Sequence, residues 1–458
     1  MNRNPPFVFL IACHLFLFIS NLFAQVYFGL PVEIYAKRRA SFLQQMPDHS
    51  IAVFQSATAK TRSRDINFEY RQNSDLLYLT GISQPNTALI LVKNVSSAGV
   101  SENTSEILFL PKITRRNVEG TSINEEIAKN VLGFKKVFDR AAFNKKFNTF
   151  LKNKKVLFAK FEPDFVYEPL SQKRYFIGRE AKKLLREKYP GLRVESPGKI
   201  MTRLREIKSQ EELKLMQKAI DITCDAHIQA MRNARPGMYE YELEAIIEYV
   251  FKRSGAQYPA FPSIIGSGPN STIIHYWRNE RKMQSGDVVV IDIGAEYFGY
   301  AADVTRTLPV NGKFTPAQRE LYEIVLRAQK EAIAAVRPGI PFRKIHKIAR
   351  QVIESAGFGK YFIHSTSHYL GMDVHDVGDY RKLKPGMVIT VEPGIYIPEG
   401  SPADKKYWNI GIRIEDDVLV TKTGHKVLSL RAPKEIKAIE SLMEKSVGMS
   451  SKEFLQKE

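Results

Sequence analysis

The second half of the chain contains an internal repeat, and this repeat constrains the fold more than any other feature. Residues 285–294 align with residues 385–394, and each copy runs from a glycine through an apolar stretch to an acidic residue, Asp292 or Glu392. Two copies are too few for an open solenoid. The repeat therefore predicts a closed domain with pseudo-twofold symmetry, in which Asp292 and Glu392 occupy equivalent places.

A second pair of matching segments lies upstream of these two copies. Arg235-Pro236-Gly237-Met238 is echoed by Arg337-Pro338-Gly339-Ile340, and a helix-like segment follows each, ending near Ser254-Gly255 or Ala356-Gly357. Each half of the repeat is thus expected to contain a helix followed by an apolar strand that ends in an acid. An acid at the same place in both halves indicates one shared site between them.

Each repeated acid has an expected partner across a turn. A hairpin centred in the turn-rich stretch after Asp292 places that residue opposite Asp303. A hairpin centred in the polar loop 398–406 places Glu392 opposite Glu415. Four carboxylates gathered at the centre of a domain would repel one another strongly at low dielectric. The pattern therefore predicts that cations hold them together.

A histidine-rich segment, residues 364–376, supplies the expected nitrogen ligand. One neutral imidazole beside four hard oxygen ligands, with no thiolate, suits a pair of divalent ions such as Mn²⁺, Zn²⁺ or Co²⁺. Two ions about 3.5–4 Å apart would share a bridging hydroxide and clamp a tetrahedral intermediate. A single aspartate at a strand end is usually a solvated cap, but four acids in repeat-related hairpins favour a metal site.

Several longer motifs follow one another along the chain: Tyr70–Asp75, Ile274–Tyr276, Asp292–Gly294, Asp303–Thr307, His364–Asp376, Val391–Gly394 and Ile412–Asp416. In this order they resemble bacterial Xaa-Pro aminopeptidase (aminopeptidase P), over the whole chain after its first two dozen residues. The resemblance implies a pita-bread fold for the catalytic half. We therefore expect an α/β amino-terminal domain followed by an α+β pita-bread catalytic domain with an internal pseudo-twofold repeat.

The resemblance also implies five metal ligands, and all five are intact: Asp292, Asp303, His368, Glu392 and Glu415. Asp303 and Glu415 would bridge two divalent ions. Asp292 would hold one of the ions, while His368 and Glu392 would hold the other. Mn²⁺ is the metal that we expect first, with Zn²⁺ or Co²⁺ as alternatives.

Further roles follow from the same resemblance. His275 and His375 would contact the scissile carbonyl and support the oxyanion, a role in which loss of one donor costs about 3–4 kcal/mol. His364 and Tyr396 would border the proline ring of the substrate. Glu392 is expected to act also as a proton shuttle, so that His275, His375 and Glu392 form the expected catalytic set.

Arg413 matches an arginine that supports the metal ligands in the family. It lies two residues before Glu415 on the same strand face, so we expect it to orient that carboxylate by charge-assisted hydrogen bonds. The alternative for Arg413 is a charge-balancing surface residue. Asp65, in the amino-terminal half, joins Arg413 in the expected substrate-binding set. Asp376 and Asp416 lie next to motif residues and are expected as supporting or capping groups.

The first half of the chain is expected to form a separate domain, because short apolar segments alternate with helical or polar stretches. The segments expected as strands are 50–54, 77–80, 88–92, 107–110 and 155–159. A long helical pattern begins around Ser209. We divide the chain into a signal peptide (1–24), an aminopeptidase P amino-terminal domain (25–200) and a pita-bread metallopeptidase domain (201–458).

Two stretches contribute nothing to the resemblance. Residues 115–123 lack the tryptophan and arginine usual in the family at this point, which leaves the contacts made by that loop open. Residues 434–458 are charged and helix-like, and are expected to form a surface tail.

The first 25 residues are predicted to be a secretory signal. Arg3 gives a positive start, residues 7–23 are almost wholly apolar, and cleavage is expected after Ala24. The alternative is a retained membrane anchor. We expect an exported protein, periplasmic or secreted. Cleavage would leave Cys224 as the only cysteine, which excludes an intrachain disulfide.

The net charge of +19 does not by itself indicate a nucleic-acid partner. Lysines and arginines are spread along the chain, often beside glutamates, and no nucleic-acid-binding motif accompanies them. We therefore expect proline-containing peptides as partners, no nucleic acid, and a homo-oligomer, either a dimer or a tetramer.

Three classes of function compete. The first is a metallo-aminopeptidase that releases the N-terminal residue from peptides with proline in second position. The second is a related enzyme on the same site, either a dipeptide-restricted prolidase or a methionine aminopeptidase. The third is a non-catalytic pita-bread module that binds peptides. The intact ligands argue against the third class and the large first domain argues against a methionine aminopeptidase, but prolidase stays open.

Overall fold

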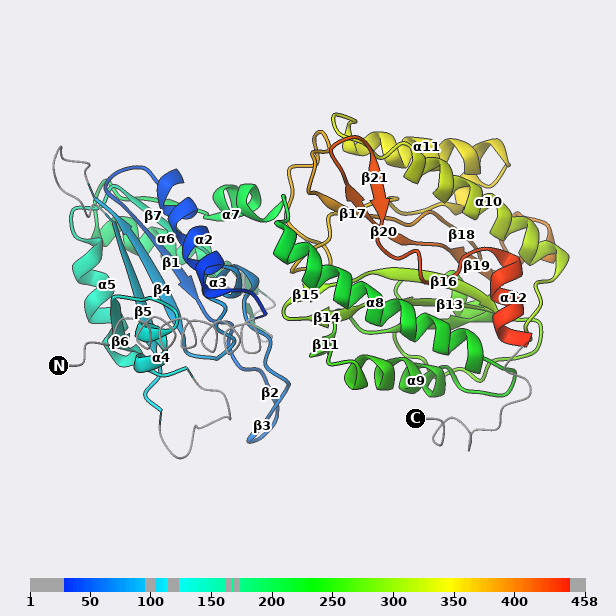
Figure 1. Ribbon diagram of the computed structural model, residues 1–458, viewed down its shortest axis with the longest axis horizontal. Helices are drawn as coiled ribbons and strands as arrows, with labels where there is room; N and C mark the ends of the chain where they lie inside the picture. The colour runs from blue at the N-terminus through cyan, green and yellow to red at the C-terminus, as the bar shows by residue number, and fades with distance from the viewer. Residues whose placement is uncertain (1–28, 95–103, 114–122, 162–165, 169–172, 445–458) are drawn as a thin grey trace, which may run out of the picture. The chain divides into compact units, whose positions relative to one another are not determined.

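The structure is a computed structural model (Figure 1). It describes residues 29–94, 104–113, 123–161, 166–168 and 173–444. The expected signal peptide, residues 1–24, lies outside the described residues, and so does nearly all of the divergent stretch 115–123. Within the described part of the chain, no helix combines the length and the apolar character needed to cross a bilayer.

The chain divides into two compact units, Met1–Leu204 and Arg205–Glu458. The amino-terminal unit is built on a six-stranded mixed sheet with the order β10-β7-β1-β4-β5-β6. These strands are β1 (Ser50–Gln55), β4 (Ala88–Lys93), β5 (Thr104–Leu110), β6 (Lys136–Asp139), β7 (Val156–Ala159) and β10 (Arg193–Glu195). Two further hairpins are formed by β2 (Thr61–Ser63) with β3 (Ile66–Asn67) and by β8 (Val166–Glu168) with β9 (Lys173–Tyr175).

Helices cover both faces of this sheet. They are α2 (Val32–Gln45), α3 (Ser74–Thr80), α4 (Glu125–Asn130), α5 (Phe143–Leu151), α6 (Ile177–Lys188) and α7 (Gly198–Arg205), the last reaching the start of the second unit. On one face Phe42 of α2 packs edge-on against Phe54, with ring centroids 5.2 Å apart. On the other face Phe143 of α5 contacts Phe109, with ring centroids 5.1 Å apart. The successive strand residues Val53 and Phe54 serve opposite faces, as the alternation of a strand requires.

One strand expected in this unit is a helix. Residues 77–80 belong to α3, because Asn73 accepts hydrogen bonds from the backbone N–H groups of Asp75 and Leu76 and so begins a helix. Gly81 ends the helix in the left-handed region, with φ of 73°. The short apolar run fits either a strand or a buried helix, and the capping residues on each side decide between them.

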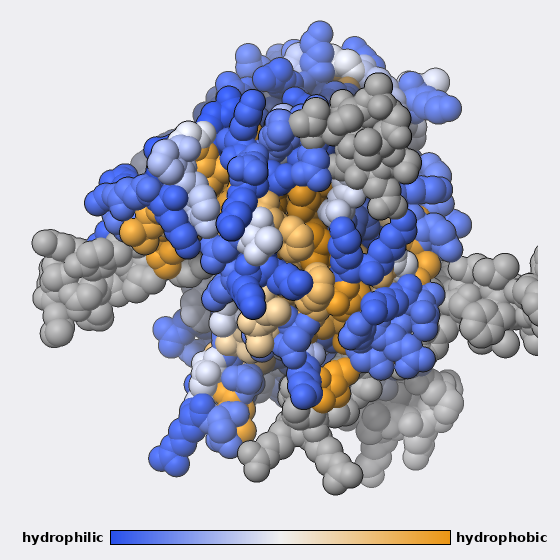
Figure 2. Space-filling view, turned by 90° about the vertical axis from the view of Figure 1, so that its left-hand side faces the viewer, coloured by the Kyte–Doolittle hydropathy of each residue, from blue (hydrophilic) through white to orange (hydrophobic). Residues whose placement is uncertain are grey.

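Figure 2 shows a face of the amino-terminal unit as a space-filling view. Hydrophilic side chains dominate this face, and apolar ones form a band through the middle of the view. The exposed apolar residues of this unit include Ile66 and Phe68 at the β2–β3 hairpin. This hydrophilic face fits a charge that is spread along the sequence rather than gathered in one segment.

The second unit, Arg205–Glu458, has two helix pairs with strands between them (Figure 1). We call it the catalytic unit because it contains the expected site residues other than Asp65. The pairs are α8 (Gln210–Asn233) with α9 (Glu240–Arg253) and α10 (Pro316–Ala334) with α11 (Phe342–Ser355). The first half contains β11 (Tyr258–Pro259), β12 (Ile264–Ser267), β13 (Val288–Ile293), β14 (Ala295–Tyr297), β15 (Tyr300–Ala301) and β16 (Val304–Pro309). The second half contains β17 (Val388–Val391), β18 (Gly394–Ile397), β19 (Ile410–Arg413), β20 (Asp416–Val420) and β21 (His425–Val427). As expected, α8 begins after Ser209, which forms a capping box with Glu212.

The internal repeat is visible in matching backbone hydrogen bonds. The N–H of Gly237 donates to Met283 O and the N–H of Gly339 donates to Leu383 O, both at 2.9 Å. The two glycines have φ of 89° and 82°, which a residue with a side chain rarely adopts. The paired halves confirm the predicted pseudo-twofold repeat.

The predicted register of the first hairpin is wrong by one residue in its turn. Asp292 pairs with Thr305, rather than with Asp303. The reason is a two-residue turn at Phe298 and Gly299, whose φ values of 47° and 77° match a type I′ turn. Asp303 still lies on the same face as Thr305, so the two acids stay close together.

The predicted register of the second hairpin is confirmed. Val391 pairs with Asp416 on one side of the acids, and Gly394 pairs with Arg413 on the other. Glu392 therefore lies across from Glu415, as expected. The two halves then join through β16, where the hydroxyl of Thr307 donates to Arg413 O at 2.9 Å.

The expected surface tail begins as a packed helix. Residues 436–444 form α12 (Ile436–Glu444), and Ile436, Ile439 and Met443 are buried in the core of the catalytic unit. Their spacing of three and four residues puts them on one helix face. The part of the tail after residue 444 lies outside the described residues.

Candidate metal centre and active site

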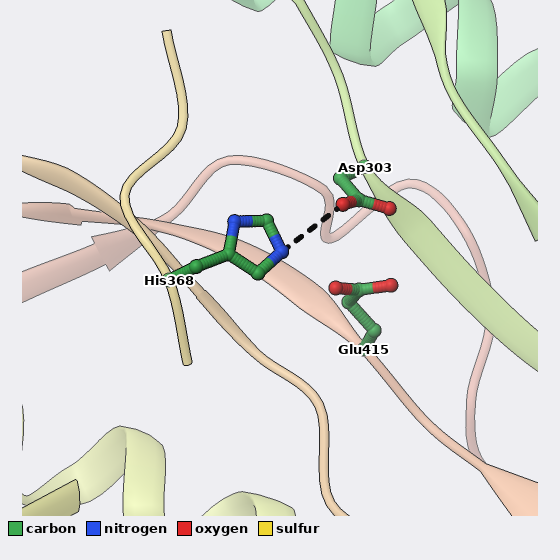
Figure 3. A group of neighbouring side chains, drawn as sticks. All are labelled: Asp303, His368 and Glu415. Atoms are coloured by element: carbon green, nitrogen blue, oxygen red, sulfur yellow. Dashed lines mark ion pairs between the residues drawn. The ribbon is translucent and has the colours of Figure 1, made fainter. Parts of the chain in front are cut away.

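Asp303, His368 and Glu415 converge where the two halves of the catalytic unit meet (Figure 3). One ligand atom from each lies within 4.8 Å of the others. Asp303 precedes β16, Glu415 lies between β19 and β20, and His368 lies in the loop before β17. The repeat thus brings three residues together, although the first and the last, Asp303 and Glu415, are more than one hundred positions apart in the chain.

The ring of His368 turns its Nε2 towards the acids. Its Nδ1 lies 3.0 Å from the carbonyl oxygen of Tyr369, so Nδ1 carries the hydrogen. Its Nε2 lies 3.3 Å from Asp303 Oδ2 and 3.5 Å from Glu392 Oε1. A ring whose Nδ1 bonds to a backbone carbonyl and whose Nε2 faces two carboxylates has the orientation of a metal ligand.

Burial and mutual repulsion make the carboxylates unfavourable as free anions. Burial raises the pKa of Asp303 well above its ordinary value, and Asp292 raises it further. Burial also raises the pKa of Glu415 well above its ordinary value, with Asp303 and Glu392 adding to the effect. Burial raises the pKa of Glu392 to about 7. Divalent cations would remove this penalty, so the donor set fits the expected metal ions.

Arg413 is buried and donates to the acid of the first repeat. Its guanidinium lies 2.6 Å from Asp292 Oδ2, and only 2% of its side chain is exposed. The surface alternative for Arg413 is therefore wrong. We expected Arg413 to donate directly to Glu415. Its Nε–H instead donates to Thr305 Oγ1 at 3.2 Å. The other oxygen of Asp292, Oδ1, is buried without a hydrogen-bond partner, as a metal-facing oxygen would be.

Thr305 connects the two halves and was missed in the sequence. Its hydroxyl donates to Glu415 Oε2 at 2.7 Å, and its carbonyl oxygen accepts the N–H of Glu415 at 3.1 Å. The available signal was its place two residues after Asp303, on the same strand face. The hydroxyl of Thr305 accepts a hydrogen bond from Arg413 and donates one to Glu415, so it links the guanidinium to that carboxylate.

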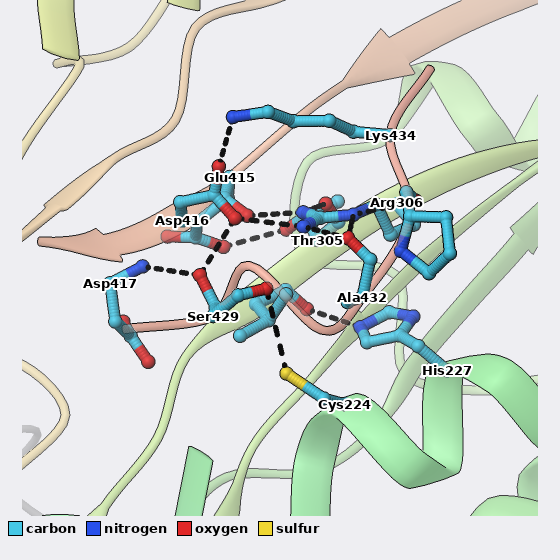
Figure 4. Close-up of polar contacts among 12 residues, drawn as sticks. Cys224, His227, Thr305, Arg306, Glu415, Asp416, Asp417, Ser429, Ala432 and Lys434 are labelled. Atoms are coloured by element: carbon cyan, nitrogen blue, oxygen red, sulfur yellow. Dashed lines mark hydrogen bonds and ion pairs between the residues drawn. The ribbon is translucent and has the colours of Figure 1, made fainter. Parts of the chain in front are cut away.

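A buried ionic network lies behind the acids (Figure 4). Arg306 is fully buried, donates to the carbonyl oxygen of Glu415, and pairs with Asp416 Oδ1 at 2.7 Å. Lys434 pairs with the other oxygen of Asp416. Asp417, beside it, accepts the backbone N–H of Asp303 at 3.2 Å. Asp416 is therefore a supporting residue, as expected, and Arg306 and Asp417 are additions that the sequence did not indicate.

His364 and Tyr396 form a pair beside the acids. The Tyr396 hydroxyl lies 2.8 Å from His364 Nε2 and accepts a hydrogen bond from Arg413 at 2.8 Å. Burial lowers the pKa of His364 to about 4, and Arg413 lowers it further. His364 is therefore neutral at physiological pH. Glu392 Oε2 lies 3.6 Å from its Nδ1.

His275 and His375 are both exposed on the catalytic unit. The ring of His375 contacts that of His368, with centroids 4.4 Å apart. Burial lowers the pKa of His375, and His368 and His275 lower it further. The carbonyl oxygen of Ile274, next to His275, lies 3.5 Å from Arg413 Nη2. Both histidines therefore belong to the surroundings of the acids.

The backbone beside His375 is held by a buried ion cluster. Asp376 accepts from Arg205 and from Lys208, the latter at 3.0 Å, and the side chains of Lys208 and Asp376 are each 1% exposed. Gly371 leaves room for this cluster, because a Cβ there would lie 2.0 Å from Asp376 Oδ2. Asp376 is thus a supporting residue.

Asp65 lies in the other unit. It occupies the turn between β2 and β3 and is exposed. The catalytic unit therefore brings together every other expected site residue, while Asp65 belongs to a hairpin of the amino-terminal unit.

Comparisons with known proteins agree with this division. The profile of metallopeptidase family M24 matches residues 214–422, and that of the aminopeptidase P amino-terminal domain matches residues 35–158. Xaa-Pro aminopeptidase of Escherichia coli strain K12 is 35% identical over 443 residues, which cover 89% of this chain and 97% of that protein. Xaa-Pro dipeptidase of Pyrococcus furiosus is 43% identical over 231 residues, covering 49% of this chain and 64% of that protein.

A solved structure gives the same result. Aminopeptidase P from E. coli with the inhibitor Pro-Leu has a TM-score of 0.81 and 34% sequence identity, covering 92% of this chain and all of that one. The two-domain α/β and pita-bread architecture expected from the sequence is thereby confirmed. From its domains, its relatives and its converging acids, the chain belongs to the Xaa-Pro aminopeptidase (aminopeptidase P) family of M24 metallopeptidases, and it is a metallo-aminopeptidase.

Proposed function

We propose that the protein releases the N-terminal residue from peptides with proline in second position, and that it does so with two divalent metal ions. The observation that carries this proposal is the convergence of buried acids with His368, since one ligand atom each of Asp303, His368 and Glu415 lies within 4.8 Å of the others. The names of the similar proteins support the proline requirement.

We assign the ligands as the sequence indicated. Asp303 and Glu415 would bridge the two ions, Asp292 would hold one, and His368 and Glu392 would hold the other. The unpartnered Oδ1 of Asp292, and the Nε2 of His368 that faces Asp303 and Glu392, support this assignment. Mn²⁺ is our first choice of metal because hard oxygen ligands dominate the set, and Zn²⁺ or Co²⁺ are the alternatives.

The bond to be cut sets the chemical requirements. An Xaa-Pro bond is a tertiary amide without an N–H, and its ring blocks ordinary protease subsites. When bound, the two ions would supply an activated water and neutralise the developing charge. The departing proline nitrogen needs a proton, and Glu392, whose Oε2 lies 3.6 Å from His364 Nδ1, is the group that we expect to relay it.

The remaining histidines would support the oxyanion and border the proline ring. His275 and His375 are exposed and can donate to the oxygen of the scissile carbonyl, and the lowered pKa of His375 keeps its ring neutral. His364 and Tyr396 hold each other at 2.8 Å and would border the proline ring with a fixed surface. Arg413 fixes both Asp292 and Tyr396.

The ligand assignment is tested with Asp303→Asn and Glu415→Gln. Each variant should lose nearly all activity and part of its bound metal, and the loss should exceed that of Arg413→Met. Asp48→Asn, at an exposed acid of the other unit, is the control. Full turnover in excess chelator, or wild-type activity in Asp303→Asn, would contradict the metal site.

The substrate class is tested with Mn²⁺-loaded protein on Xaa-Pro-Xaa peptides, Xaa-Pro dipeptides and Xaa-Ala controls. We expect cleavage of the longer proline peptides. The similarity of the catalytic half to a dipeptidase keeps prolidase as the second candidate. Cleavage of dipeptides alone would make the protein a prolidase, and equal cleavage of Xaa-Ala peptides would remove the proline requirement.

We further propose that the protein is exported, periplasmic or secreted, and acts as a homo-oligomer. The positive start and apolar stretch of residues 3–23 support export. Mass spectrometry of the protein from its source should find a chain that begins near residue 25, and an intact Met1 in a cytosolic fraction would contradict export. Light scattering should give the mass of a dimer or a tetramer, and the mass of one chain would contradict the oligomer.

A further inference from the structure

Glu240, the first residue of α9, is a fully buried acid outside the metal centre. Its Oε1 accepts the N–H and the hydroxyl of Ser267, both at 2.7 Å. Its Oε2 accepts the hydroxyl of Tyr276 at 2.8 Å and the N–H of Arg281 at 2.9 Å. Asn270 donates to the same carboxylate at 3.2 Å. All these donors lie within residues 267–281, so one carboxylate binds several points of a single segment of the chain.

The fold alone does not require an acid at this position. Phe342 is the equivalent residue of the second half, at the start of α11. The backbone hydrogen bonds are the same in both halves, since the N–H of Glu240 donates to Arg281 O at 2.9 Å and that of Phe342 to Arg381 O at 2.7 Å. A buried carboxylate is costly unless donors surround it, so its use in one half only calls for a local reason.

His275 belongs to this segment, residues 267–281, whose groups donate to Glu240. On one side of this histidine, the carbonyl oxygen of Ile274 is 3.5 Å from Arg413 Nη2. On the other side, Tyr276 donates to Glu240. Burial raises the pKa of Tyr276 and the bond to Glu240 raises it further, so the hydroxyl stays protonated and donates. The exposed ring of His275 is therefore held through the residues on either side of it.

The second half uses the same arrangement with different chemistry. The ring of Phe342 contacts that of Tyr369, with centroids 5.0 Å apart, and Tyr369 directly follows His368. In each half, the residue that begins the second helix thus contacts the tyrosine that follows a site histidine. The contact is a hydrogen bond for His275 and an aromatic contact for His368.

We propose that Glu240 is a positioning residue for His275, acting through the hydroxyl of Tyr276. The proposal rests on the proposed function, since it assumes that His275 contacts the scissile carbonyl. Glu240 fixes the backbone of the segment, so the ring of His275 is already in place before a peptide binds. A donor aimed in advance at a developing oxyanion loses no free energy in reorganisation.

Tyr276→Phe tests this with the smallest change, because it removes one hydroxyl and keeps the ring. Tyr407→Phe is the matched control, since the hydroxyl of Tyr407 donates to Glu320 at 2.7 Å, a bond of the same kind outside the site. We expect Tyr276→Phe to lower kcat/KM by about tenfold, as for other residues that orient a site group. The loss should be mainly in kcat, with metal content unchanged. Tyr407→Phe should keep wild-type kinetics.

A double-mutant cycle separates positioning from general damage. In a His275→Ala background, Tyr276→Phe should have less than about a twofold further effect, because the group that it positions is gone. A full tenfold effect in that background would overturn the proposal, and so would unchanged kinetics of Tyr276→Phe in the wild-type background.

A measurement that does not depend on turnover distinguishes the positioning role of Glu240 from the proposed function. Hydrogen–deuterium exchange of the peptide 268–281 should be several-fold faster in Tyr276→Phe than in the wild type or in Tyr407→Phe. Equal exchange in all three proteins would show that Glu240 does not hold the segment. Faster exchange in a protein that cleaves no Xaa-Pro bond would contradict the proposed function instead.

Discussion

Chelator-treated protein should become less stable as the pH rises from about 5 to about 8. The group responsible is Glu392, whose pKa burial raises from 4.5 to about 7. Asp303 and Asp292 raise it further, while His368 and Arg413 oppose them. Each pH unit of difference between the folded and unfolded pKa is worth about 1.4 kcal/mol, so Glu392 alone contributes about 3 kcal/mol.

The direction follows from proton binding. Between pH 4.5 and about 7 the folded protein keeps a proton on Glu392 that the unfolded chain has released. Its contribution to the free energy of unfolding is therefore fully present below pH 4.5 and is lost as the pH rises through about 7. Burial also raises the pKa values of Asp303 and Glu415, so these acids act in the same direction.

Urea unfolding of chelator-treated protein at pH 5 and pH 8 measures this effect. The wild type should lose about 3 kcal/mol more than Glu392→Gln over this range, and added Mn²⁺ should restore the stability of the wild type at pH 8. Glu399→Gln, at an exposed acid, should behave as the wild type does. If Glu392→Gln showed the same pH dependence as the wild type, the reasoning would be refuted.

Three further outcomes are expected. Burial raises the pKa of the Cys224 thiol to about 12, so iodoacetamide at pH 8 should label it only after unfolding, as peptide mass spectrometry can check; labelling of the native protein at the unfolded rate would contradict this. Gly371→Ala would place its Cβ 2.0 Å from Asp376 Oδ2 and should lower the free energy of unfolding in urea by about 2 kcal/mol or more. Gly424→Ala, in open space, should change it by less than about 0.5 kcal/mol, and equal effects would exclude the steric cause. Arg413→Lys should lower kcat/KM about tenfold or more, because an ammonium cannot reproduce the guanidinium bonds to Asp292 and Tyr396, and unchanged kinetics would contradict that role.

Asp292 and Glu392 were predictable because each follows an apolar stretch in a repeated pattern, and Asp303 and Glu415 because each is a partner across a turn. The register of the first hairpin was not, because it depends on a turn of only two residues, Phe298 and Gly299. Moving the centre of the turn by one residue moves every pair, and Asp292 faces Thr305 instead of Asp303. The longer polar loop of the second hairpin happened to be centred correctly, which gave Glu392 opposite Glu415.

The supporting residues could not be predicted, for a different reason. The hydroxyl of Thr305 meets Glu415, and the guanidinium of Arg306 meets Asp416, across a separation of 110 residues in each case. Local spacing carries no information about such contacts. The error at α3 has a local cause, because its apolar run fits strand and helix equally until the capping role of Asn73 is recognised.

The buried Arg306 also sets an order for biosynthesis. Its side chain emerges from the ribosome long before its partner Asp416, and before Ala432, whose carbonyl oxygen it also contacts. Until those residues follow, burying the guanidinium would leave a charge unpaired, which is strongly unfavourable. We therefore expect the first half of the repeat to stay open until the second half has been translated. The proposed metal site would then form only in the nearly complete chain, in which the carboxylates from both halves are present together.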